Sequence, residues 1–169
     1  PSLFRIDHDR VERIFKACSD KVEDIPFYFC NTNTISTAAK SWVTDSRFST
    51  QGYRWVETNV ESTTIDKLVK DFGVPDHIKI DVEGYEETAL HGMTSKYSPE
   101  ICFEWAEEEG ESAVRCVEYL KNLGYREFGY IITDSYLVKP DKYFSLKEFK
   151  EDFSYDSERK TEWGMVWAR

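Results

Sequence analysis

Two carboxylates and a glycine lie close together in the middle of the chain, at Asp81, Glu83 and Gly84. Asp81 belongs to residues 77–82, a short segment rich in β-branched apolar residues that is typical of a buried strand. Ligands of open α/β sheets bind beyond the carboxyl ends of the strands, so Asp81 would face the ligand crevice. There it could pair with a cationic group or accept a proton from a hydroxyl. Because an acid flanked by apolar residues is costly to bury unpaired, we expect Asp81 to be functional.

A helix is expected directly after this strand. Gly84 permits an abrupt turn and a close approach of the backbone. Glu83 and Glu86 would then lie near the N-terminus of the helix, where the helix dipole favours negative charge. Stabilisation of the helix start is therefore an alternative explanation for both, and it is the favoured one for Glu86. Glu83 stays a candidate catalytic residue beside Asp81.

Polar residues also accompany two other predicted strand ends. Ser19 and Asp20 follow the first predicted strand, and they are equally compatible with a ligand contact and with an ordinary turn. Glu104 and Trp105 stand near the end of a later strand. Trp105 would be partly packed, with one face open for binding, whereas alternation along the strand leaves the direction of Glu104 open.

A polar loop spans residues 31–37 between two predicted strands, and such loops often carry function when a scaffold flanks them. Ser36 is its candidate ligand contact. Ser36 and Thr37 could instead cap the helix that follows, since hydroxyl residues favour that position.

The predicted elements alternate between strand and helix through the middle of the chain, which indicates an α/β fold with a mostly parallel sheet and right-handed crossovers. Thr64 would cap one helix, and Gly73 would end it. The expected strands span residues 11–18, 25–30, 53–60, 77–82, 100–106, 125–133 and 163–168, with 53–60 at an edge. The expected helices span residues 38–43, 64–72, 85–92, 112–123 and 146–153.

Composition limits the function classes. The 169 residues are 40% hydrophobic, which suits one globular domain over residues 1–169. The net charge of −10 argues against a nucleic-acid partner, because a phosphate-binding groove needs basic side chains. No apolar run is long enough for a membrane span, and no secretory leader opens the chain, so a cytoplasmic location is expected. The four cysteines form no CxxC pair and no histidine stands at ligand spacing from them, so we expect free thiols and no metal site.

Three segments together resemble the FkbM family of S-adenosylmethionine-dependent methyltransferases. The first contains Ala17-Cys18-Ser19-Asp20 and the strand that follows it. The second is the most specific, and the third is the strand that contains Glu104 and Trp105. The second segment reads Thr64-Ile65-Asp66-Lys67-Leu68, then Ile78-Lys79-Ile80-Asp81-Val82-Glu83-Gly84-Tyr85-Glu86, then Leu90-His91-Gly92.

The resemblance implies a fold, a cofactor and roles. The fold would be the Rossmann-like class I methyltransferase sheet, with an antiparallel last strand at residues 163–168. The reaction would be O-methylation of a hydroxyl, often on a sugar or another small molecule. Asp81 and Glu83 would act at the reacting end, Asp81 also contacting the cofactor. The remaining roles are Ser19 and Asp20 near the adenine and Ser36, Glu104 and Trp105 on the acceptor side.

One departure from the family pattern matters. The glycine-rich cofactor loop after the first strand and the acid that ends the second strand are both missing from this sequence. We therefore expect the first two strands to be absent, which would leave a gap between the strand of residues 11–18 and that of 77–82. The sequence leaves three explanations open: a fragment of a longer protein, a second chain that fills the gap, or a rearranged sheet. Exposed strand edges favour association, so the alternative function is a non-catalytic module for homodimerisation or protein binding.

Overall fold

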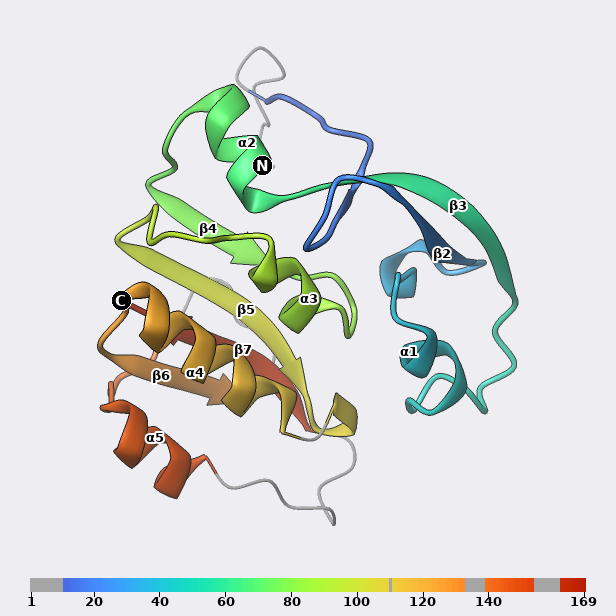
Figure 1. Cartoon of the computed structure of the whole chain (residues 1–169). Helices are drawn as coiled ribbons and strands as arrows, with labels where there is room; N and C mark the ends of the chain where they lie inside the picture. The colour runs from blue at the N-terminus through green and yellow to red at the C-terminus, as the bar shows by residue number, and fades with distance from the viewer. Residues whose placement is uncertain (1–10, 110, 133–138, 154–161) are drawn as a thin grey trace, which may run out of the picture.

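The computed structural model describes residues 11–109, 111–132, 139–153 and 162–169. It contains two mixed β-sheets with helices beside them (Figure 1), which confirms the α/β class. The strands are β1 (Ala17–Cys18), β2 (Asp24–Cys30), β3 (Trp55–Thr63), β4 (His77–Ile80), β5 (Glu100–Ala106), β6 (Phe128–Ile132) and β7 (Trp163–Ala168). The helices are α1 (Lys40–Thr44), α2 (Ile65–Phe72), α3 (Glu86–His91), α4 (Ser112–Leu123) and α5 (Leu146–Asp152), with 3-10 turns η2 (Asn33–Ile35) and η3 (Glu107–Glu109).

The larger sheet has the strand order β4-β5-β7-β6. β4 and β5 run parallel, and β7 is antiparallel to both β5 and β6, as expected for the last strand. The prediction of a mostly parallel sheet is wrong for the described strands, because they form two sheets in which β2 is also antiparallel to β3. The register pairs Ile80 with Phe103, so the chain leaves β4 where β5 reaches Glu104. This register brings the two acid-bearing strand ends side by side.

The main core lies between this sheet and α3, α4 and α5 (Figure 1). Phe103 and Val166 from the sheet and Leu120 and Phe149 from the helices are fully buried there. Burial of an aliphatic or aromatic side chain of this size stabilises the fold by about 1.5–3 kcal/mol. The core therefore holds β5 rigidly, and with it the residues at its carboxyl end.

The smaller sheet has the order β1-β3-β2 and is formed from residues that precede α2. β2 pairs with β3 along the whole length of β2, from Cys30 opposite Trp55 to Asp24 opposite Glu61. No β-pairing in the described ranges joins the two sheets. Cys18 of β1 and residues of β4 instead line a groove of about 620 Å³ between the sheets. The gap was predicted within one sheet, whereas β1 and β4 belong to different sheets.

The helix α2 begins and ends at the residues that the sequence predicts for its cap and its stop. The Thr64 side chain accepts a hydrogen bond from the backbone N–H of Lys67, which satisfies one of the donors left open at a helix start. Gly73 follows the last turn of α2 with φ 97°, a backbone conformation that residues other than glycine rarely adopt. The predicted cap and stop are both confirmed.

Two strand predictions need correction. The first predicted strand shrinks to β1, because pairing with β3 begins only at Ala17 and residues 11–16 are exposed, Phe15 by 90%. The predicted edge strand at residues 53–60 changes at its end: β3 extends to Thr63 and lies between β1 and β2 in strand order, but β1 pairs only with Ser62 and Thr63, so residues 55–60 pair with β2 alone. Its parallel partner β1 is only two residues long, too short to leave a pattern in the sequence.

Two further strands are shorter than predicted. β4 ends at Ile80, because the Val82 N–H donates to the Glu86 carboxylate rather than to a neighbouring strand. β6 begins at Phe128, because the Tyr125 N–H donates to Leu120 at the end of α4. Position 133, the predicted end of this strand, lies outside the described residues.

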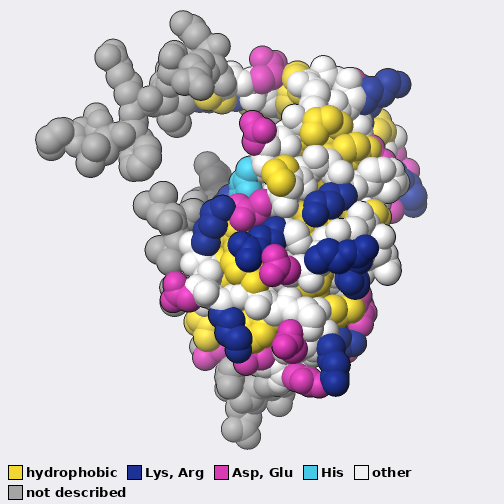
Figure 2. Space-filling model, turned by 90° about the vertical axis from the view of Figure 1, so that its left-hand side faces the viewer, with side chains coloured by type: hydrophobic (Ala, Val, Ile, Leu, Met, Phe, Trp, Pro, Cys, Tyr) yellow, Lys and Arg dark blue, Asp and Glu magenta, His cyan; other side chains and the backbone are white. Residues whose placement is uncertain are grey.

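Figure 2 shows one face of the molecule, on which lysine and arginine side chains lie among hydrophobic and acidic groups. Within the described residues, no helix is both long and apolar enough to cross a membrane.

Candidate functional site

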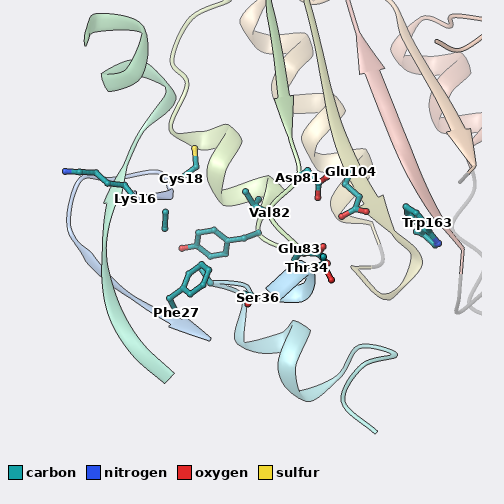
Figure 3. Close-up of a pocket in the computed structure, with 13 residues that line it drawn as sticks. Lys16, Cys18, Phe27, Thr34, Ser36, Asp81, Val82, Glu83, Glu104 and Trp163 are labelled. Carbon is teal, nitrogen blue, oxygen red and sulfur yellow. The ribbon is translucent and has the colours of Figure 1, made fainter. Parts of the chain in front are cut away.

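A pocket of about 670 Å³ lies beyond the carboxyl ends of β4 and β5 (Figure 3). The smaller sheet and the loop after β2 form one wall, with Phe27 and Ser36, and the larger sheet forms the other, with Glu104 and Trp163. This is the edge at which open α/β sheets bind ligands. The pocket therefore has one wall from each sheet.

Three carboxylates gather on the wall formed by the larger sheet. Asp81 and Glu83 come from the turn after β4, and Glu104 comes from β5. One oxygen from each lies within 4.8 Å of the others, and all three side chains are half-buried. The parallel register of β4 and β5 creates this arrangement, because it places the residue after Ile80 beside the residue after Phe103.

The positive charge next to these carboxylates is limited. The Lys79 ammonium lies 2.5 Å from an Asp81 oxygen. Arg47 also acts on Glu83, but its guanidinium forms an ion pair with Glu108 at 3.2 Å. Groups of acidic side chains that reach the surface are common without a bound ion, so the cluster does not by itself make a metal site.

Burial and mutual repulsion change the acidity of two of these groups. Desolvation, followed by the charge of Asp81, raises the pKa of Glu83 to about 7, against the lowering effects of Arg47 and Lys79. Desolvation also dominates for Glu104, and the charges of Asp81 and Glu83 add to it, which raises the pKa of Glu104 to about 9. At neutral pH the cluster therefore retains protons that exposed carboxylates would have lost.

The turn that holds Glu83 is fixed by a threonine from the other wall. Glu83 has φ 56°, and it is the one residue other than glycine with positive φ in the described part of the chain. Its carbonyl oxygen accepts a hydrogen bond of 2.7 Å from the Thr37 hydroxyl. Thr37 is fully buried, and its hydroxyl also accepts from the Ala39 N–H at 2.8 Å. This left-handed backbone is unfavourable for glutamate, so the contact stabilises a strained conformation.

The comparison with protein families decides the kind of protein. The chain matches the family model of the methyltransferase FkbM domain over residues 8–127, more than half of its length. The chain belongs to the FkbM methyltransferase domain family. Membership supports methyltransferase activity and confirms the resemblance seen in the sequence. No curated protein and no solved structure matches the chain significantly.

Of the residues predicted from the FkbM pattern, Asp81, Glu83, Glu104 and Ser36 line the pocket. Ser36 also accepts a hydrogen bond from the Cys30 N–H through its hydroxyl. The structure thus brings together four of the seven predicted side chains. Their individual roles in the FkbM domain stay predictions.

Ser19 and Asp20 lie near the pocket but do not line it. Ser19 is only 1% exposed, and its carbonyl oxygen packs so closely against Gly92 that a Cβ atom there would lie 2.2 Å away. Gly92 belongs to the family signature, and this contact gives a physical reason for glycine at that position. Asp20 is exposed, and Cys18 is the residue of this segment that reaches the pocket wall.

Trp105 lies on the opposite face of β5 from Glu104. Its ring is 6% exposed and packs edge-on against Phe153, with ring centres 4.9 Å apart. It belongs to the main core and does not line the pocket. The tryptophan on the pocket wall is Trp163, from β7. No pattern in the sequence distinguishes Trp163 from Trp105 as the pocket residue, because both stand in apolar strands.

Four other residues that line the pocket were not predicted from the sequence as site residues. Phe27 and Tyr85 add aromatic surface, and Thr34 and Lys16 add polar groups. They come from four separate segments whose own patterns indicate only strands and turns. Glu86, in contrast, agrees with the interpretation favoured for it, stabilisation of a helix start. It is buried at the start of α3, and its carboxylate accepts a hydrogen bond from the Val82 N–H at 2.9 Å.

Proposed function

We propose that this protein is an S-adenosylmethionine-dependent O-methyltransferase that acts on a hydroxyl of a small, sugar-like acceptor. The observation that carries the proposal is the carboxylate cluster of Asp81, Glu83 and Glu104 at the strand ends, open to a pocket of about 670 Å³ in an FkbM domain. A pocket of that size suits a small-molecule site.

The residues present suit a cationic cofactor and a neutral polar acceptor. S-adenosylmethionine, when bound, supplies a methyl group activated by a positively charged sulfur. Asp81 and Glu83 would hold that charge, with Asp20 and Ser19 on the adenine side. Phe27 and Tyr85 present aromatic rings to the pocket, and such rings pack well against the apolar faces of sugars.

The contribution of the chain to the reaction would be positioning and proton transfer. Methyl transfer of this kind is an in-line displacement, in which the new O–C bond forms as the S–C bond breaks, so orientation supplies much of the acceleration. Ser36 and Glu104 would orient the acceptor through hydrogen bonds. Asp81 would accept the proton that the hydroxyl loses, with Glu83 beside it as the second acceptor.

Calorimetry and a transfer assay test the proposal. We expect the protein to bind S-adenosylmethionine and its demethylated product. Asp81→Asn should weaken the affinity for S-adenosylmethionine at least tenfold, and it should weaken the affinity for the product less, because the sulfur of the product carries no positive charge. Glu57→Gln, an exposed change on β3, is the matched control and should bind like the wild type. Transfer of labelled methyl to a panel of neutral sugars then identifies the acceptor. Absence of binding to either cofactor form would refute the proposal.

The alternative is a non-catalytic module for homodimerisation or protein binding. It is supported by the groove beside β4, which is lined by apolar residues of α2 such as Leu68 and Phe72, the latter 58% exposed. Sedimentation analysis separates the two functions. A stable dimer without cofactor affinity would favour the module, whereas a monomer that binds cofactor would favour the enzyme.

We also propose a reducing, cytoplasmic environment for the protein. Cys18, Cys30, Cys102 and Cys116 are all free thiols. Disulfides are rare in such a compartment, so four unpaired cysteines support this location.

A further inference from the structure

Glu104 occupies a position where a second negative charge is poorly tolerated. It projects from β5 toward Asp81 and Glu83, with one oxygen of each group inside a 4.8 Å cluster. On the neighbouring strand β7, the residue paired with it is Met165, which offers no charge. From α3, Glu86 adds a fourth carboxylate to its surroundings.

The cations near the cluster act on its other carboxylates. Lys79 contacts Asp81 at 2.5 Å. Arg47 acts on Glu83 and is itself paired with Glu108. For Glu104, the largest influences are desolvation and the three carboxylates of Asp81, Glu83 and Glu86, and all of them oppose ionisation. Carboxylates that share a site keep a proton between them, and this distribution of charge assigns that proton to Glu104.

We propose that Glu104 is held as a neutral carboxylic acid, and that its O–H donates a hydrogen bond to the Asp81 carboxylate. In this arrangement Glu104 is a positioning residue. It accepts no proton from the acceptor, keeps Asp81 charged, and holds the Asp81 oxygens toward the pocket. Asp81 is then the member of the pair available as the proton acceptor. The pKa of Glu104, raised to about 9 by desolvation and the neighbouring acids, agrees with this assignment.

The protonation state can be measured without any assay of activity. Protein labelled with ¹³C at the glutamate carboxyl carbons is titrated by NMR, and the Glu104 signal is identified by its loss in Glu104→Gln. We expect this signal to titrate above pH 8, well above the ordinary range of a glutamate carboxyl group, about pH 4 to 5. Titration of Glu104 in that ordinary range would overturn the proposal.

Kinetics test the positioning role, which rests on the proposed methyltransferase function. The amide of Glu104→Gln keeps a donor for Asp81 and an oxygen that can accept from the substrate hydroxyl, so we expect kcat/KM to fall, but by no more than about threefold. Glu104→Ala removes the donor, and we expect a loss of at least tenfold. The wild-type rate should fall above about pH 9 as Glu104 ionises, and this decline should vanish in Glu104→Gln.

The possible failures are distinguishable. If Glu104→Gln loses as much activity as Glu104→Ala, with both variants folded, the positioning role is refuted. If the NMR titration places Glu104 above pH 8 but the wild type shows no methyl transfer, the neutral acid stands and the proposed function fails. Should Glu104→Ala not fold, the NMR titration and the pH profile of Glu104→Gln still decide the proposal.

Discussion

Replacing Thr37 by valine tests whether the two walls of the pocket are joined by the contact described above. The substitution keeps the shape of the side chain and removes one hydroxyl. That hydroxyl donates to the Glu83 carbonyl oxygen at 2.7 Å and accepts from the Ala39 N–H at 2.8 Å. In Thr37→Val both backbone groups lose their partner, and the Ala39 contact is buried.

The magnitude follows from the number of groups left unsatisfied. An unpaired buried backbone group costs about 1–3 kcal/mol. The contact of Glu83 is only partly buried, so the two losses together should lower the free energy of unfolding by about 2–5 kcal/mol. For a domain of this size, such a loss lowers Tm by roughly 4–20 °C. Glu83 should also leave its left-handed conformation more readily, because φ 56° is no longer held by the contact.

Urea denaturation at neutral pH measures the free energy of unfolding, and Thr37→Ser provides the matched control. Serine keeps the hydroxyl and loses one buried methyl group, so it should cost only about 1 kcal/mol. If the enzyme proposal holds, Thr37→Val should also lower kcat more than Thr37→Ser does. A valine variant within about 0.5 kcal/mol of the wild type would refute the reasoning, because surface changes without structural consequence fall in that range.

Three further predictions concern other parts of the molecule. Gly92→Ala should cost about 1–3 kcal/mol, because its Cβ atom would lie 2.2 Å from the Ser19 carbonyl oxygen and force a backbone shift; an unchanged Tm would contradict this packing. Ser145→Ala removes the capping box at the start of α5 and should cost about 1 kcal/mol in urea denaturation; equal stability of variant and wild type would argue against the cap. Folding raises the pKa of Glu104 to about 9, above its value in the unfolded chain. Protonated Glu104 therefore stabilises the folded state fully at pH values below the unfolded pKa, and this stabilisation is lost as the pH rises to about 9. Glu104→Gln should therefore gain stability relative to the wild type across this range, by up to about 1.4 kcal/mol per pH unit, and a pH-independent difference in Tm would refute the shift.

Short-range patterns in the sequence determined much of the fold. The boundaries of β5, α4 and β7 agree with the predicted ranges, because strand composition and helix periodicity are local properties. The cap at Thr64 and the stop at Gly73 were likewise legible, since each depends on one residue type at one position. Asp81 could be recognised as a strand-end carboxylate for the same reason.

The central position of β3 and the direction of Trp105 needed the tertiary structure. β3 acquires a second neighbour through β1, a pairing that covers only two residues and spans a long stretch of chain. Trp105 faces the core because Phe153 packs against that side of β5. Both outcomes depend on partners distant in sequence, and alternation along a strand shows only that neighbouring residues face opposite ways, not which way is inward.

The chemistry of the site likewise depends in part on local sequence and in part on contacts between residues that are distant in the sequence. The sequence by itself supplied the carboxylates and the glycine turn, together with a family signature that places them in a methyltransferase domain. Only the parallel register of β4 and β5 brought Glu104 beside Asp81, and only the fold placed Thr37 against Glu83. The acidity of a carboxylate depends on its burial and on charges within a few ångströms. Those neighbours come from different strands and loops, so the pKa values of Glu83 and Glu104 are properties of the folded protein.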